Sequence, residues 1–164
     1  MAASLGINES IFNNYLSESF QITADARGVL EFPRELPGFL VVVFAGILGA
    51  LTLTRLGALA AIVFAVGTAG LGFAGNSYAF MIIAMMISSA GMHLLQPVTH
   101  SLAIAMSDEN RRGFRLGQLG GMRTLGVILG SGLIWLTFRG GGSHFMAGFL
   151  CAAAGGVIVA ALYS

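Results

Sequence analysis

The sequence contains no lysine, a single cysteine and little charge of either sign. Its eight basic residues are all arginines, and with seven acidic residues they bring the charged share to 9% and the net charge to +1. An ordinary soluble domain carries about 25% charged residues. Cys151 has no second cysteine with which to form an intrachain disulfide or a cysteine-based zinc site. The arginines are scattered between hydrophobic blocks, so we expect no nucleic-acid partner.

Most of the chain consists of long apolar stretches. Hydrophobic residues make up 56% of it, 24 residues are glycine, and the mean hydropathy is +0.86. Residues 56–107 carry no formal charge, and a run of this length can cross a bilayer twice at about 20 residues per helix. Glycine-rich apolar segments are typical of membrane helices that pack backbone to backbone. The sequence therefore predicts an all-α, polytopic membrane helix bundle whose first partner is the lipid bilayer.

The alternation of apolar and polar stretches predicts one transmembrane bundle over residues 1–164. Residues 1–20 have one apolar helical face but are too polar and too short to span, so we expect a partial first helix there. A polar connector follows, and Pro33 and Pro37 bracket the beginning of the next helix. Full spans are expected over residues 36–54, 56–75, 78–106, 114–138 and 145–163.

Arginines are distributed unequally between the two ends of these spans. Arg55, Arg111, Arg112 and Arg115 fall on one side of the alternation. Basic residues in short loops favour the cytoplasmic side. We therefore expect a multi-pass protein of a bacterial inner (plasma) membrane, with its C-terminus in the cytoplasm.

Three short motifs resemble those of one transporter family. Residues 50–57 read ALTLTRLG, where major facilitator superfamily transporters have G-x-L-x-D-R-x-G, with Ala50, Thr52 and Thr54 in place of the Gly, Leu and Asp. Residues 93–97 read HLLQP, where many members have R-x-x-Q-G in the fourth helix. Residues 111–113 read RRG ahead of a glycine-rich span, as at the beginning of the family's fifth helix.

The resemblance implies that the chain is the N-terminal six-helix half of a major facilitator superfamily transporter, either a truncated product or a half that must pair. Complete members have two six-helix halves and bind substrate between them near the bilayer midplane. The implied partners are a small-molecule substrate and either a missing C-terminal half or a second copy of the chain. The implied function is transport of a small solute by alternating access; the alternative is a small structural or accessory membrane protein without a substrate of its own.

Five polar residues are candidates for the substrate site: Asn8, Asn13, His93, Gln96 and Arg123. A charge inside a span is usually functional, although Arg123 lies near enough to the loop for its side chain to extend to the membrane interface. His93 and Gln96 are three residues apart and share a helix face. They either line a cavity, beside the bend expected at Pro97, or hydrogen-bond to a neighbouring helix.

An enzyme is not expected. Ser131 lies between two glycines, as a nucleophile would, but His144 follows in a distant loop and no third residue orients it. The chain has no phosphate-binding loop, no paired catalytic carboxylates and no metal-ligand spacing. We therefore expect neither a cofactor nor a bound metal.

Overall fold

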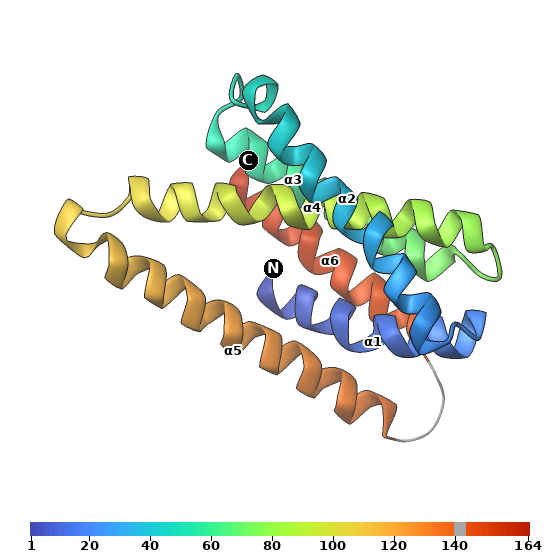
Figure 1. Ribbon diagram of the computed structural model, residues 1–164. Helices are drawn as coiled ribbons and strands as arrows, with labels where there is room; N and C mark the ends of the chain where they lie inside the picture. The colour runs from blue at the N-terminus through green and yellow to red at the C-terminus, as the bar shows by residue number, and fades with distance from the viewer. Residues whose placement is uncertain (140–143) are drawn as a thin grey trace.

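A computed structural model describes residues 1–139 and 144–164, apart from the side chains of residues 24 and 44–46. The loop expected at residues 140–143 lies outside this part. The described residues form a bundle of six α-helices and one short 3-10 helix (Figure 1). They are α1 (Ala2–Phe20), α2 (Ala24–Leu48), α3 (Leu53–Phe73), α4 (Tyr78–Ala105), η1 (Glu109–Arg111), α5 (Arg112–Phe138) and α6 (Phe145–Tyr163). The expectation of an all-α bundle is confirmed.

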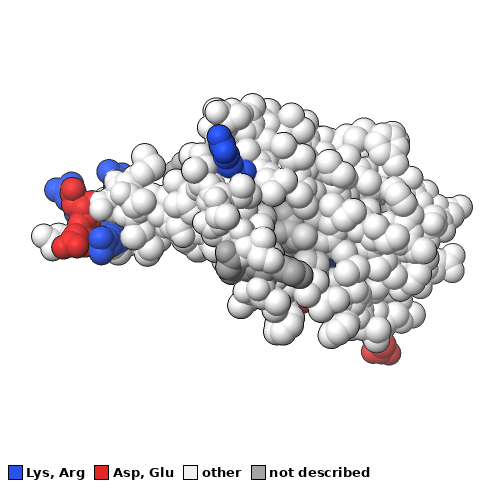
Figure 2. All heavy atoms as spheres, turned by 90° about the horizontal axis from the view of Figure 1, so that it is seen from above, with Lys and Arg blue, Asp and Glu red and all other residues white. Residues whose placement is uncertain are grey.

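Four segments of the described chain are long and apolar enough to cross a membrane. They are Leu53–Phe73, Tyr78–Ala105, Glu109–Phe138 and Phe145–Tyr163, with mean hydropathies between 1.4 and 2.2. Large apolar side chains such as Ile62, Ile128 and Trp135 are exposed on the surface of the bundle, as expected where the surrounding solvent is hydrocarbon. In Figure 2 a group of charges marks the end where α4 joins α5, and most of the visible surface carries none. These features indicate a multi-pass membrane protein.

The second helix differs most from the expectation. It begins at Ala24, so the expected polar connector is helical, and both Pro33 and Pro37 lie inside the helix. A proline inside a helix removes one backbone hydrogen bond, and neighbouring helices can compensate by supplying a donor. Here the Ser89 hydroxyl of α4 donates to the backbone carbonyl of Arg34. The carbonyls that lose their helical donor to Pro33 and Pro37 are those of Val29 and Pro33, so the Ser89 bond ties α2 to α4 and does not replace the missing helical bonds.

The N-termini of α3 and α4 are both capped by side chains. Thr52 Oγ1 accepts a hydrogen bond from the Arg55 backbone nitrogen at 3.4 Å at the start of α3, and Ser77 Oγ accepts one from Phe80 at 3.4 Å at the start of α4. Such caps satisfy backbone donors that a helix leaves free at its first turn. The turn between these helices includes Gly75 at a φ of 53°, in the left-handed region that favours glycine. This short turn, which ends at the cap residue Ser77, joins α3 and α4 as antiparallel neighbours.

Glycines allow the closest helix contacts in the bundle. A Cβ at Gly67 of α3 would lie 2.1 Å from the Ser88 backbone nitrogen of α4. A Cβ at Gly130 of α5 would lie 2.2 Å from the carbonyl oxygen of Ala3 in α1. Both distances are below any tolerable contact, so the backbones approach as closely as they do only because these side chains are absent. The expected role of glycine in packing thus applies to α3–α4 and α1–α5.

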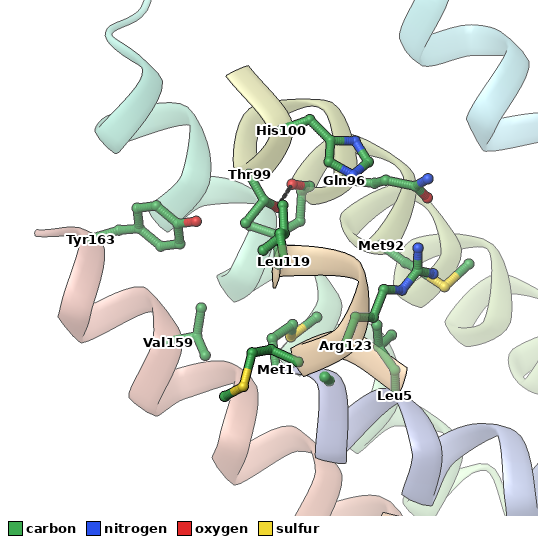
Figure 3. A pocket seen from close by; sticks show the side chains of 13 residues that line it. Met1, Leu5, Met92, Gln96, Thr99, His100, Leu119, Arg123, Val159 and Tyr163 are labelled. Carbon is green, nitrogen blue, oxygen red and sulfur yellow. Dashed lines mark hydrogen bonds between the residues drawn. The ribbon is translucent and has the colours of Figure 1, made fainter. Parts of the chain in front are cut away.

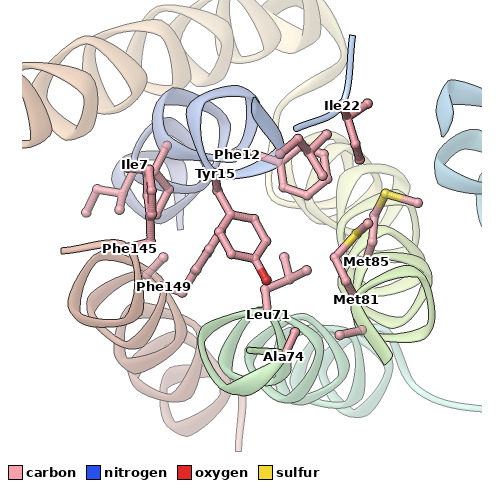
Figure 4. Close-up of a cluster of buried hydrophobic side chains, with 14 of the residues drawn as sticks. Ile7, Phe12, Tyr15, Ile22, Leu71, Ala74, Met81, Met85, Phe145 and Phe149 are labelled. Carbon is pink, nitrogen blue, oxygen red and sulfur yellow. The ribbon is translucent and has the colours of Figure 1, made fainter. Parts of the chain in front are cut away.

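The main hydrophobic core lies among α1, α3, α4 and α6 (Figure 4). The Tyr15 ring makes edge-to-face contacts with Phe149 and Phe145, at centroid distances of 5.1 and 5.6 Å. Aromatic pairs in this geometry are worth about 0.5–1.5 kcal/mol beyond the area that they bury. One buried polar pair crosses the α3–α4 contact, where Thr68 Oγ1 and Ser88 Oγ are 2.8 Å apart. The core fixes α1 against the membrane-length helices.

Candidate functional site

A cavity of about 320 Å³ lies between α1, α4, α5 and α6. We call it the apolar cavity, because most of its lining is aliphatic, thioether or aromatic (Figure 3). Its volume is at the lower end of the range of about 300–1,000 Å³ typical of small-molecule sites. It is lined by Met1, Ala2, Leu5, Met92, Leu95, Gln96, Thr99, His100, Leu119, Met122, Arg123, Val159 and Tyr163.

Arg123 is the charged side chain of this lining. It projects from α5, and its guanidinium points to the side of the cavity where Met92 and Gln96 lie (Figure 3). Val159 and Tyr163 of α6 line the opposite side. No carboxylate among the described residues lies within ion-pair distance of Arg123. The cavity therefore has one end with an unpaired cation and another end that is largely apolar.

Gln96 and His100 supply further polar groups from α4. They are four residues apart, so they lie one above the other on the same helix face. Thr99 lies between them in the sequence, and its hydroxyl donates to the Leu95 carbonyl one turn earlier in its own helix. Gln96 and His100 are thus the polar α4 side chains of the lining that make no hydrogen bond to another described residue. Both residues are exposed, so the helices of this chain do not close the cavity completely.

A second hollow of about 250 Å³ lies between α1, α2, α3 and α4. We call it the polar cavity. Its lining consists of Asn8, Glu9, Phe12, Asn13, Arg34, Phe64, Leu71, Met85, Ser88, Ser89 and Met92. The Asn8 side-chain oxygen is buried and makes no hydrogen bond to any described residue. An acceptor left free in this way suits a ligand or water that donates a hydrogen bond.

The two cavities follow one another along α1 and α4. On α1 the lining passes from Leu5 in the apolar cavity to Asn8 in the polar one, and on α4 the change occurs at Met92, which lines both. The cavities thus form two consecutive hollows with Met92 between them. Side chains of α1 and α4 therefore line both cavities, one after the other along the bundle.

The sequence candidates are divided between these hollows. Gln96 and Arg123 come together in the apolar cavity, and Asn8 and Asn13 come together in the polar cavity. His93 lines neither. Its Nε2 atom lies 3.2 Å from Glu35 Oε2 of α2, and its ring lies against Gly38. Residues three apart on a helix differ in direction by about 60°, enough for Gln96 to face the cavity while His93 faces α2.

The pair Ser88 and Ser89 was not among the sequence candidates, although both line the polar cavity. Two consecutive hydroxyls inside an apolar run are the signal that points to them. Arg34, expected in a solvated charge cluster, lines the same cavity while its Nε atom lies 3.2 Å from Glu31 and 3.4 Å from Glu35. Its charge is therefore balanced, unlike that of Arg123.

Ser131 takes part in the contact between α1 and α5. Its hydroxyl accepts a hydrogen bond from Ser10 at 2.8 Å and lies 3.5 Å from the Gly6 carbonyl. Among the described residues no group of histidine, cysteine or acidic side chains is arranged to hold a metal ion. The geometry around Ser131 is that of a helix-packing residue.

Comparison with known proteins gives no assignment: no model of a protein family and no curated protein sequence matches the chain. What the structure defines is the class, a six-helix all-α protein with four candidate membrane spans.

Proposed function

We propose that this protein carries a small solute across a membrane by alternating access, as one six-helix half of a transporter of the major facilitator type. The proposal joins the sequence motifs at residues 50–57, 93–97 and 111–113 to two properties of the bundle. One is the way in which the helices pair. The other is the position of the polar side chains.

The observation that carries the proposal is the pairing of the helices. The main contacts are α1 with α5 and α6, α3 with α4 and α6, and α2 with α4. Exchanging the first three helices for the last three converts each of these pairs into another member of the set. Each helix also runs opposite to its counterpart: α1 to α4, α2 to α5 and α3 to α6 (Figure 1). Inverted three-helix repeats of this kind are found within each half of major facilitator transporters.

The cavities support the same proposal. Substrate sites of secondary transporters lie between halves, on helices that contribute polar groups near the bilayer midplane. Gln96 and Arg123 lie within membrane-length helices, away from the helix ends. Both line a cavity and are exposed. In the proposed assembly a second six-helix unit covers this face, and rocking of one unit against the other opens the site to each side in turn. That unit is a C-terminal half or a second copy of the chain.

Reconstitution in liposomes tests the proposal. The purified protein is incorporated into vesicles, and uptake of radiolabelled benzoate, proline and glucose is measured as probes for an anion, a zwitterion and a neutral solute. Saturable uptake of at least one probe above that of protein-free vesicles is expected. The oligomeric state of the same preparation is measured by multi-angle light scattering, because a half is expected to act as a pair. If the preparation is assembled and no probe enters faster than into protein-free vesicles, the proposal is contradicted and an accessory role is favoured.

A further inference from the structure

We infer that the apolar cavity binds a small organic anion with an apolar body, a monocarboxylate being the simplest example. The inference rests on the proposed transport function for its biological meaning, but binding is measurable without transport. It is carried by three features of the cavity: an unpaired cation, polar groups beside that cation and an apolar opposite wall.

The first feature is the unbalanced charge of Arg123. A charged side chain within a membrane-length helix is costly, and such residues normally pair with an opposite charge or face a water-filled site. Arg34, in the polar cavity, follows this rule through its contacts with Glu31 and Glu35. Arg123 has no carboxylate within ion-pair distance among the described residues, and its cavity has no acidic lining residue. The missing partner is therefore an anion from outside the described chain.

The second feature is the chemistry next to the guanidinium. Gln96 lies on the side of the cavity to which Arg123 points, and His100 lies one helix turn further along α4 (Figure 3). A guanidinium presents paired N–H donors that match the two oxygens of a carboxylate, and a neighbouring amide or imidazole N–H adds a further donor. These groups suit a planar carboxylate. A ligand that carries an ammonium group would instead be repelled by Arg123.

The third feature is the remainder of the lining. Val159 and Tyr163 line the side of the cavity opposite the guanidinium (Figure 3), and Leu5, Leu95 and Leu119 add apolar lining. Burial of apolar surface contributes about 25 cal/mol per Å², so an apolar body adds affinity that acetate does not gain. The volume of about 320 Å³ admits a small ring or short chain. The cavity is too small for a lipid or a peptide.

Equilibrium binding of benzoate to the purified protein in nanodiscs tests the inference. Benzamide has the same shape without the charge, and acetate has the charge without the apolar body. We expect benzoate to bind about tenfold or more tightly than either, because a charge-assisted pair and an apolar contact are each worth at least a factor of that order. Arg123→Gln is expected to reduce benzoate binding to the level of benzamide. Arg123→Lys is expected to recover part of the affinity, because it restores the charge without the paired donors.

The matched control is Arg115→Gln, the same change two turns earlier on α5 and outside the cavity lining. It is expected to leave benzoate binding unchanged, and thermal unfolding in the same nanodiscs shows whether each variant remains folded. Equal binding of benzoate and benzamide, or benzoate binding that is unchanged in folded Arg123→Gln, overturns the inference. Arg123-dependent benzoate binding without uptake into liposomes supports the inference and contradicts transport. Saturable uptake of glucose together with benzoate binding that is unchanged in Arg123→Gln supports transport and contradicts the inference.

Discussion

Gly91 of α4 lies against the backbone of Phe64 in α3, so closely that a Cβ at position 91 would come within 2.2 Å of the Phe64 nitrogen. The contact belongs to the tightest helix pair of the bundle, in which Gly67 packs in the same way against Ser88. Because both obstructing groups are backbone atoms, neither can move aside as a flexible side chain would. The antiparallel arrangement of α3 and α4 therefore depends on these two glycines.

Gly91→Ala is expected to destabilise the protein. Overpacking at a rigid contact typically costs about 1–3 kcal/mol, and the added methyl forces α3 and α4 apart. The measurement is thermal unfolding in detergent, followed by tryptophan fluorescence or circular dichroism. The control is Gly117→Ala on α5, where an added Cβ meets no described atom within 4 Å. Equal melting temperatures for the two variants would contradict the close contact between Gly91 and the Phe64 backbone.

The hydrogen bond between Thr68 and Ser88 provides a second, independent test of the same interface. The two hydroxyl oxygens are buried and 2.8 Å apart. Hydrogen bonds between membrane helices average about 0.6 kcal/mol and rarely exceed about 1.7 kcal/mol in double-mutant cycles. A cycle of Thr68→Val, Ser88→Ala and the double variant is expected to give a coupling in this range. A coupling indistinguishable from zero would mean that the hydroxyls find other partners.

His93 is expected to act in helix packing and to leave ligand binding unaffected. Its Nε2 atom lies 3.2 Å from Glu35 Oε2, and its side chain is 24% exposed. His93→Gln keeps a polar side chain against α2 and removes the contact between the imidazole and Glu35; contacts between partly exposed polar or charged side chains are worth at most about 0.2–1 kcal/mol. We predict a small loss of thermal stability and benzoate affinity equal to that of the parent protein. A loss of affinity like that of Arg123→Gln would place His93 in the site after all.

The parts of the fold that could be predicted from the sequence are those decided by hydrophobic length alone. The helix expected at residues 78–106 is observed as Tyr78–Ala105, and the one expected at 145–163 as Phe145–Tyr163. Both follow uncharged runs that have few alternatives to a membrane-spanning helix. The beginning of α2 could not be predicted in this way. Pro33 argues locally against a helix, and the bond from Ser89 to Arg34 comes from a helix more than fifty residues away in the sequence.

The candidate site, too, could be predicted from the sequence only in part. The polarity of Gln96 and Arg123 within apolar surroundings marked them in the sequence, and the structure places both at one cavity. The direction of His93 depends instead on where α2 packs, because a difference of about 60° around α4 decides which neighbour it meets. Helical periodicity gives the angle between residues on one helix, whereas the position of the neighbouring helices is a property of the whole bundle.

The distribution of the arginines predicts an orientation of the bundle in the membrane. The α2–α3 connection, the α4–α5 connection and the C-terminus gather at one end of the bundle (Figure 1), and this end carries Arg55, Arg111, Arg112 and Arg115. Basic residues near the ends of spans are retained on the cytoplasmic side. In a bacterial host, a green fluorescent protein fused after Ser164 is therefore expected to fluoresce, and alkaline phosphatase at the same place is expected to be inactive.

A triple variant, Arg111→Gln, Arg112→Gln and Arg115→Gln, tests whether these charges cause the orientation. Removing three of the four arginines leaves Arg55 against Arg27, Arg34 and Arg139 at the opposite end, so the bias is lost or reversed. We expect phosphatase activity to rise and fluorescence to fall for the C-terminal fusions. Arg123→Gln serves as the matched control, because that residue lies within a span and leaves the loop count unchanged. Fusions that report the same orientation in the triple variant would assign the topology to the order of the spans and not to the α4–α5 arginines.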